Sequence, residues 1–533
     1  MIMIIYKVKQ REHYFIHRLL RRCLRLRSLT TKQQHQQHHH KQHDTSTRQS
    51  ILFLSPTSWP EPNATAAGTR TMSLLQHFSP SCPSIPSSIS SSLFHSVHFG
   101  CGANLPRLYG KGSNGYDDIQ WHRVKPNRPD DMVKLIQKIE TENGPVKAVV
   151  FDRFYAEEAY SFRIREECPN ALRVLDMQDV QSLRVGRQYL VDQHDKSNIE
   201  SSVDGKYSLM TPQLMDTVMN FDPSTSMLHP QKNKNKKEHQ SRLKLHDTFL
   251  RELASVHRSD LVLVCSSEEM EMLERKWQIP RWKLVPASFF CSEPKNWDAG
   301  TPSFDERTDF VTVGGFKHPP NVDCINILHK LWPQIRVRLP AAKMHVYGAY
   351  PSEKVLSLHD EKNGFLVHGH VEDLDGILKK SRVLLAPLRF GAGIKGKIVD
   401  AWRCGCPVIT TPVGAEGMRD MSNAGVTSGT EASWGGRIVM NEDDFVSNAV
   451  SMYYDKTLWY ECQGQARSLV NTLFDRNKNL SIVDHAINDA LVNMDDRRRL
   501  DLVGSLLWHQ NFRSTEYFSR WIELKESTKE KHL

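Results

Sequence analysis

Short runs of apolar residues without polar alternation recur along the chain, separated by segments with helical periodicity. The first run, Ile51–Ser55, is followed by a loop that opens on Gly68 and by a helical pattern over Thr69–Phe78. Uninterrupted apolar runs of this length are typical of strands covered on both faces, as in a doubly wound parallel sheet. The same alternation predicts further strands over 146–151, 172–176 and 261–265, with helices over 156–167 and 245–257.

A second series of alternating strands and helices begins at Phe310. It predicts strands over 310–313, 344–347, 365–367, 383–388 and 407–411, and helices over 322–331, 353–359, 374–380 and 394–403. Two such series predict the α/β fold class, with two Rossmann-like domains that face each other across a cleft. We expect the hinge between the domains in the coil around 293–303.

These patterns divide the chain into four parts. Residues 1–49 form a basic, low-complexity leader, 50–298 the N-terminal domain, 299–510 the C-terminal domain and 511–533 a C-terminal helix or tail. Within the N-terminal domain we predict a solvated insertion at about 195–241, because this stretch ends in the basic run Lys232–Lys237. The aromatic residues of Trp508–Trp521 are interpreted as the packing face of a helix that crosses back over the cleft.

Composition and charge exclude two classes of protein. The 533 residues are 39% hydrophobic, yet no apolar run reaches the eighteen residues of a membrane-spanning helix. The net charge is +9, but the first fifty residues alone hold eleven Lys and Arg against two acids, so the rest of the chain is neutral. A nucleic-acid-binding domain needs a basic face on its folded body, and we therefore expect no nucleic-acid partner.

The leader and the cysteines give information about the cellular compartment. The leader is poor in acids and can form an Arg-rich amphipathic helix over Arg18–Arg27, as plastid and mitochondrial transit peptides do. An incidental extension on a cytoplasmic protein explains the same composition. The ten cysteines lack the paired spacing of a zinc ribbon or disulfide scaffold, which favours a reducing compartment, and we assign Cys404 and Cys406 to packing.

The most informative segment is 383–400, where a predicted strand leads through a loop with Gly391 and Gly393 into a helix. The start of a helix carries partial positive charge and favours acids, yet no acid occurs after Asp375 until Asp400. The segment carries Arg389, Lys395 and Lys397 instead, at a cost of about 0.3–1 kcal/mol for each cation in the first turn. An anionic ligand such as a diphosphate offsets that cost, so we favour a diphosphate site over a solvated basic turn.

A second glycine turn follows the first strand of the same domain. Gly314 and Gly315 let a backbone approach a ligand closely, and Lys317 or His318 lies within reach of that ligand. Because the carboxyl ends of parallel strands share one edge of the sheet, both glycine turns are expected there.

These motifs resemble those of a known enzyme family. Gly314–Asp323, Val346–Gly348, His368–Val371, Ala386–Lys397 and Ala401–Gly417, in this order and spacing, resemble the donor domain of the group-one (family four) retaining glycosyltransferases, which have the GT-B fold. Further similarities to that family lie at 51–68, 151–158, 175–184 and 261–268. The likeness covers roughly residues 50–480.

The resemblance implies a metal-independent transfer of a sugar, with retention of configuration, from a nucleotide-sugar to an unknown acceptor. A UDP-sugar is favoured over a GDP-sugar as substrate, and no cofactor is implied. The N-terminal domain would then face the acceptor and the C-terminal domain would bind the donor. The implied catalytic residues are Lys395, Lys397, Arg389 and Gln181; the donor-binding residues are Gly314, Gly315, Lys317, Asn321, Gly391, Ala392, Gly393, Ile394, Asp400 and Glu416; and the acceptor-side residues are Gly68, Asp152 and Asp179.

Two positions depart from the family pattern. Ala392 stands where the family has the first of two carboxylates spaced eight apart, and Gln181 stands where related sequences have a histidine that faces the donor sugar. Glutamine cannot carry a positive charge. A catalytically inactive homologue that binds a nucleotide-sugar or a protein is therefore the alternative to an enzyme. A nucleotide-dependent oxidoreductase has no support, because no Gly-x-Gly-x-x-Gly follows a strand with an acid about twenty residues on.

Overall fold

The structure is a computed structural model, and it describes residues 48–62, 64–80, 93–106, 118–126, 128–201, 208–227, 236–291, 301–419 and 434–530. Residues 1–47 of the predicted leader and 293–300 of the predicted hinge lie outside the described residues, as does most of the basic run that ends the predicted insertion. None of the helices in the described ranges is long and apolar enough to cross a membrane.

The N-terminal domain contains a seven-stranded sheet in the order β3-β2-β1-β4-β5-β6-β7, with every neighbouring pair parallel. Its strands are β1 (Ser50–Ser55), β2 (Ser96–Cys101), β3 (Ile119–Arg123), β4 (Val146–Asp152), β5 (Leu172–Asp176), β6 (Leu261–Val264) and β7 (Leu284–Pro286). Its helices include α2 (Ala66–Phe78), α3 (Pro129–Asn143), α4 (Phe154–Glu167), α5 (Gln181–Ser201), α7 (Lys236–Arg258) and α8 (Ser267–Glu271). The predicted strands and helices are confirmed, whereas strands β2, β3 and β7 and helices α3, α5 and α8 were not predicted.

The apolar run of β1 shows why these residues form a central strand. Successive side chains of a strand point to opposite faces, and here both faces are covered. Leu52 and Leu54 pack into one core cluster, whereas Ile51 and Phe53 pack into another. Alternation of polar and apolar residues is therefore absent, as it is in other buried parallel strands.

The C-terminal domain repeats this architecture. Its six-stranded parallel sheet has the order β10-β9-β8-β11-β12-β13. The strands are β8 (Thr308–Val313), β9 (Met344–Tyr347), β10 (Phe365–Gly369), β11 (Ser381–Ala386), β12 (Val408–Thr410) and β13 (Gly436–Ile438). The helices are α10 (Pro319–Arg338), α11 (Glu353–Leu356), α12 (Leu374–Lys380), α13 (Gly396–Arg403), α14 (Pro412–Ala415), α15 (Glu442–Tyr454) and α16 (Lys456–Leu473).

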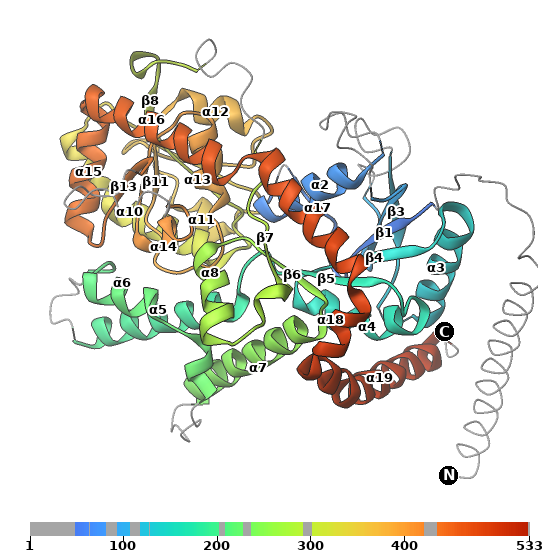
Figure 1. The fold of residues 1–533 in the computed structure, drawn as a ribbon. Helices are drawn as coiled ribbons and strands as arrows, with labels where there is room; N and C mark the ends of the chain where they lie inside the picture. Colours follow the sequence, from blue (N-terminus) through green and yellow to red (C-terminus); the bar gives the residue numbers. More distant parts are fainter. Residues whose placement is uncertain are drawn as a thin grey trace, which may run out of the picture. The chain divides into compact units, whose positions relative to one another are not determined.

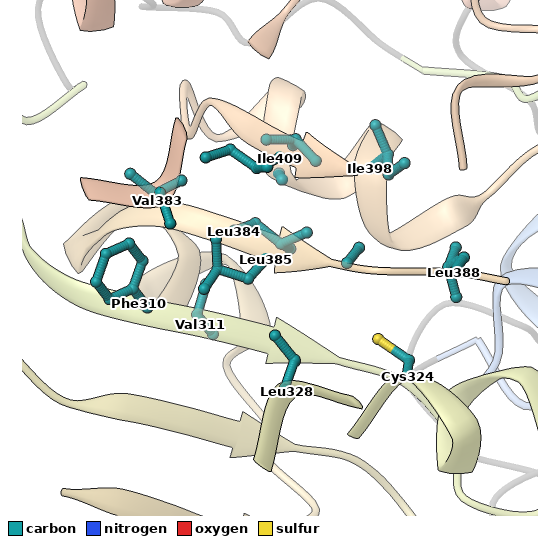
Figure 2. Packing of buried hydrophobic residues seen from close by; sticks show 14 of the residues in the cluster. Phe310, Val311, Cys324, Leu328, Val383, Leu384, Leu385, Leu388, Ile398 and Ile409 are labelled. Carbon is teal, nitrogen blue, oxygen red and sulfur yellow. The ribbon is translucent and has the colours of Figure 1, made fainter. Parts of the chain in front are cut away.

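The core of this second sheet positions the helix that follows the glycine loop. Figure 2 shows Cys324 and Leu328 of α10 next to strand β8. Ile398 of α13 lies on the other side, near strands β11 and β12. Ile398, Ala401 and Trp402 are buried, whereas Lys397 and Asp400 are only half-buried. Packing of the apolar face therefore fixes where the first turn of α13 and its two lysines lie.

The last helices return to the N-terminal domain. Residues of α17 (Arg476–Val492) belong to the same core cluster as β1, and α17 contacts β6 and β7. The chain continues as α18 (Met494–Leu500) and α19 (Leu502–Glu530), and α19 packs against α7 and α4 (Figure 1). The return thus begins at Arg476, earlier in the chain than the Trp508–Trp521 stretch from which we predicted it.

One helix of the predicted insertion is packed rather than solvated. α6 (Pro212–Met219) buries Leu214, Met215 and Val218. These side chains belong to the core cluster of the C-terminal domain, together with Val191 of α5, and α6 contacts α14. The basic run Lys232–Lys237 concealed this apolar helix, because the prediction rested on charge.

Candidate functional site

Two glycine loops meet at the carboxyl edge of the C-terminal sheet. β8 leads into Gly314, and its neighbour β11 leads through 387–395 into α13. β8 and β11 also mark the point at which the strand order reverses, since β9 lies on the other side of β8. Ligands of open parallel sheets bind at such a point, outside the carboxyl ends of the strands.

The start of α13 has the features noted in the sequence. Lys395 is its N-cap residue and makes no capping hydrogen bond with its side chain, and the first turn contains no acid. The Lys395 side chain is buried, and its Nζ donates to the Gly393 carbonyl at 2.5 Å. Burial lowers the pKa of Lys395, while the nearby carboxylates of Glu416, Glu269 and Asp179 oppose that shift. The ammonium thus lies among acids that come from both domains.

Lys397 connects the two glycine loops. Its Nζ donates to Asn321 Oδ1 at 2.8 Å, and Asn321 Nδ2 donates to the Gly315 carbonyl at 2.9 Å. Gly314 lies so close to Asn321 that a Cβ at position 314 would come within 2.6 Å of the amide. The glycine is therefore required here by close packing. Burial lowers the pKa of Lys397 as well.

Lys317 lies on the surface beside these loops. Its Nζ is 3.5 Å from the centre of the Tyr350 ring, and the Tyr350 hydroxyl donates to Glu61 of the N-terminal domain at 2.9 Å. The stacked ring places Lys317 in a contact that spans the two domains. Its predicted role in donor binding stays a prediction.

Arg389 is occupied by carboxylates. Its Nε donates to Asp323 at 3.0 Å, its Nη1 to Asp195 and to the Leu209 carbonyl, and its Nη2 to both aspartates. All five N–H donors of the guanidinium are thereby used. In this arrangement Arg389 joins α10 to the N-terminal domain and has no donor left for a phosphate, so the contacts do not support the catalytic role inferred from the resemblance.

The two predicted donor-binding carboxylates differ in their surroundings. Glu416 is buried and accepts two hydrogen bonds from Arg187, at 2.6 and 2.7 Å. Burial acts to raise the pKa of Glu416, but the guanidinium outweighs it and holds the pKa below the usual value. Asp400 is half-buried on α13, and burial raises its pKa to about 6. Asp400 is thus the more accessible of the two for a ribose hydroxyl.

The loop 391–394 lies against the N-terminal domain. Gly393 has a φ of +64°, and a Cβ there would come within 3.0 Å of Asp179 and of the Gln178 carbonyl. Ala392 packs against the core cluster of the N-terminal domain, and Ile394 is buried. Gly391 and Gly393 each make a hydrogen bond to that domain, to Arg187 and Glu269 respectively.

Asp152 and Asp179, two of the predicted acceptor-side residues, lie next to a strained part of the N-terminal domain. Asp152 at the end of β4 accepts from Arg153 at 3.1 and 3.0 Å and from Gln178 at 2.8 Å. Both Arg153 and Gln178 have positive φ, at 67° and 61°, and such strain in residues other than glycine is concentrated at functional sites. Asp179 pairs with Arg184 at 2.9 Å.

Gly68 and Gln181 occupy the starts of helices. Gly68 lies in the first turn of α2 and faces the backbone of Glu61, which a Cβ would approach to 2.4 Å. Gln181 begins α5, and its backbone N–H donates to the buried Glu252 at 2.8 Å. The Gln181 side chain is half-buried and makes no hydrogen bond within the described ranges.

Arg187 and Glu269 contact the glycine loop but were not predicted from the sequence. Arg187 sits in an ordinary stretch of α5, and Glu269 in a Ser-Ser-Glu-Glu run that is typical of a helix start. What sets these two residues apart from other charged residues is that their side chains are buried against the C-terminal domain. The pattern of polar and apolar positions along the sequence cannot predict such a contact. Within the described residues, no group of three or more His, Cys, Asp and Glu is placed to hold a metal ion.

Comparison with known families identifies the C-terminal domain. Residues 307–453 match the family model described as glycosyl transferases group 1. This segment is similar to the domain of the group 1 glycosyltransferases. Every predicted donor-binding residue, from Gly314 to Glu416, lies within the matched group 1 segment. No curated protein matches the chain in sequence.

Solved structures show that the fold of the chain is GT-B. HepE from Anabaena, in complex with UDP and glucose, has a TM-score of 0.53 at 11% identity, with 83% of this chain and 99% of HepE covered. A glycosyltransferase from Rickettsia africae has a TM-score of 0.52 at 12% identity, with 84% and 99% covered. TarM from S. aureus matches at 11% identity over 68% of this chain, with a TM-score of 0.44, and the chain spans 59% of its length.

Proposed function

We propose that this protein transfers a sugar from a UDP-sugar to an acceptor, with retention of configuration and without a required metal ion. One observation carries the proposal: in the group 1 domain, α13 begins with Lys395 and Lys397, no acid and no side-chain cap. A diphosphate supplies the negative charge that this helix start lacks. The retained configuration and the metal independence rest on the resemblance in sequence.

The lysines match the charge that develops during transfer. As the bond between the sugar and the diphosphate breaks, negative charge grows on the phosphate oxygens, and prearranged donors that face this charge lower the barrier. Lys395, Lys397 and the backbone N–H groups at the start of α13 are such donors. The acceptor hydroxyl forms the new bond to the sugar carbon and gives its proton to the departing phosphate oxygen. No nucleophile from the protein is then required.

UDP is the nucleotide we propose for the donor. HepE has been crystallised with UDP and with UDP-glucose, and it shares the GT-B fold with this chain. That likeness supports UDP over GDP. Asp400 is the residue we assign to the ribose, because it is a half-buried carboxylate four residues beyond the start of α13.

A thermal-shift experiment tests this function. Addition of UDP to the protein should raise its melting temperature, because a ligand that binds only the folded state stabilises it. The variant with Lys395→Ala and Lys397→Ala should lose at least 90% of that increase, since both ammonium groups are removed. The variant with Lys379→Ala and Lys380→Ala, at the exposed end of α12, is the matched control and should respond like the wild type. An unchanged melting curve with UDP and with every nucleotide-sugar tried contradicts the proposal.

A second function, nucleotide-sugar binding without transfer, is favoured by Gln181. The glutamine stands where the resemblance places a histidine, and it cannot carry a positive charge beside the donor sugar. If Gln181 impairs catalysis, Gln181→His should raise the slow release of UDP from a matched UDP-sugar by at least ten-fold, measured with a coupled assay for free UDP. An active wild type whose rate falls on this substitution argues for the enzyme. A protein that binds the donor and releases no UDP in either form is a binding module.

A further inference from the structure

Two side chains of the N-terminal domain hold the glycine loop of the donor domain. Arg187 of α5 donates from Nη1 to the Gly391 carbonyl at 2.9 Å. Glu269 of α8 accepts from the Gly393 backbone N–H with Oε1 at 2.6 Å. The two contacts lie two residues apart on the loop, and they use one acceptor and one donor of its backbone.

Arg187 is held firmly in place. Its side chain is buried, and besides the loop carbonyl it contacts both oxygens of Glu416 and the Val218 carbonyl, the latter through Nε at 3.0 Å. A guanidinium that is fixed by a bidentate carboxylate has one orientation, so its remaining donor has a fixed direction. The Gly391 carbonyl is therefore held at a set position relative to α5.

Glu269 is also buried, and it makes a second contact within its own domain. Oε1 accepts from the Val180 backbone N–H at 3.1 Å, just before α5 begins. Among the described residues no Lys or Arg lies within ion-pair distance of this carboxyl group. The charged groups that surround it are Asp179, Glu416 and Lys395. Burial raises the pKa of Glu269 to about 8, and the neighbouring Asp179 carboxylate adds to that rise.

The loop that these residues hold leads directly into the start of α13. Gly393 precedes Lys395 by two residues, and its carbonyl accepts the Lys395 ammonium. A shift of Gly391 or Gly393 therefore moves the ammonium and the N–H groups beside it. A misplacement of about 1 Å can cost about 10²-fold in rate, because charge-assisted hydrogen bonds to a phosphate depend on their geometry.

We propose that Arg187 and Glu269 are positioning residues that fix the glycine loop so that Lys395 and the start of α13 receive the donor diphosphate. The inference rests on the proposed function and extends it to the N-terminal domain. Both domains then contribute to the donor site. The residues that contact the diphosphate lie in the C-terminal domain, and the residues that orient them lie in the N-terminal domain.

The test compares UDP affinity, measured by isothermal titration calorimetry, across variants of these two residues. Glu269→Ala removes the acceptor, and we expect the Kd for UDP to rise about ten-fold, as the loss of one buried hydrogen bond implies. Glu269→Gln keeps a carbonyl oxygen for the same two N–H groups, and its Kd at pH 7 should stay within two-fold of the wild type. Arg187→Lys loses the planar fork that pairs with both oxygens of Glu416 while it holds the Gly391 carbonyl, and it should also weaken binding about ten-fold.

Matched controls separate positioning from stability. Arg258 is a buried arginine that contacts Glu157 within the N-terminal domain, and Glu252 is a buried carboxyl that accepts N–H groups at the start of α5. Neither contacts the glycine loop. Arg258→Lys and Glu252→Ala should therefore lower the melting temperature while they leave the UDP affinity within two-fold.

The pH dependence gives a readout that a purely structural role does not produce. Between pH 7 and 9 the wild type should lose UDP affinity, because Glu269 ionises beside Asp179 and Glu416 and adds negative charge near the diphosphate. Glu269→Gln should lose markedly less over the same range. Equal losses in both proteins count against the proposal.

Two outcomes of the affinity measurements overturn the inference. Wild-type affinity in Glu269→Ala and Arg187→Lys, with lowered melting temperatures, makes both residues merely structural. Tighter binding in these variants means that the contacts obstruct the site rather than shape it. If Arg187→Lys does not fold, the comparison of Glu269→Ala with Glu269→Gln decides. A wild type that binds no nucleotide instead removes the proposed function itself, and this inference with it.

Discussion

At the scale of single residues, two cationic side chains of the same loop have different contacts. Arg389 and Lys395 lie six residues apart in one loop, and the sequence assigns both to the leaving phosphate. In the structure Arg389 gives all its donors to Asp195, Asp323 and a carbonyl, while Lys395 lies at the start of α13. The difference depends on carboxylates that are distant in sequence, which a reading of the loop alone does not include.

Arg389→Met tests this division of roles. The change leaves Asp195 and the largely buried Asp323 without their partner, and removal of one member of a buried ion pair costs about 3–5 kcal/mol. We expect urea denaturation to show a loss of about 3 kcal/mol, with Asp195 partly exposed and able to regain water. The Kd for UDP should stay within three-fold of the wild type in the folded protein. If the Arg389→Met protein folds but no longer binds UDP, Arg389 contacts the phosphate, and this division of roles is wrong.

Two buried carboxyl groups predict how stability depends on pH. Burial raises the pKa of Glu252 to about 7 and that of Glu269 to about 8, above the value of about 4.3 in an unfolded chain. The folded state then binds more protons than the unfolded state between these values, so this contribution to stability falls as pH rises from about 4.5 to 8. The melting temperature of the variant with Glu252→Gln and Glu269→Gln should therefore fall less than that of the wild type from pH 5 to 8. Parallel curves for the two proteins contradict the raised pKa values.

At the scale of elements, continuous apolar runs and glycine loops were sufficient to predict the central strands and α13. The strands that were not predicted explain the limit of this method. β2 and β3 carry His98 and His122, whose rings stack with centroids 5.3 Å apart and whose nitrogens lie 3.1 Å apart. Polar residues that satisfy one another inside the protein look like loop residues in sequence, because the partner lies on another strand. β7 and β13 have three residues each, and neither is a continuous apolar run, because β7 ends in Pro286 and β13 consists of Gly436, Arg437 and Ile438.

The described part of the insertion shows the same limit for helices. α6 has eight residues and buries three apolar side chains against the C-terminal domain. Its pattern is helical, but charge in the following run dominated the prediction. α6 is packed because it contacts the C-terminal domain, and the composition of the segment does not show this contact.

At the scale of the whole molecule, helices from each domain pack on the other. α5 and α6 belong to the N-terminal domain and share the core cluster of the C-terminal one, while α17 follows the C-terminal domain and packs on the first sheet. The residues from Gly314 to Glu416 that we propose to bind the donor were identified from motifs along one stretch of chain. Arg187 and Glu269 were not, because their relation to the loop exists only once the two domains have assembled.

Hydrogen–deuterium exchange of the glycine loop and of α13, with and without UDP, tests most directly whether a diphosphate binds at the start of α13. We expect UDP to slow exchange in peptides that cover 391–400, because the free N–H groups there bind phosphate oxygens. The variant with Lys395→Ala and Lys397→Ala should show no such protection at the same UDP concentration. Protection of other peptides in the wild type, with 391–400 unchanged although UDP is bound, would contradict the account.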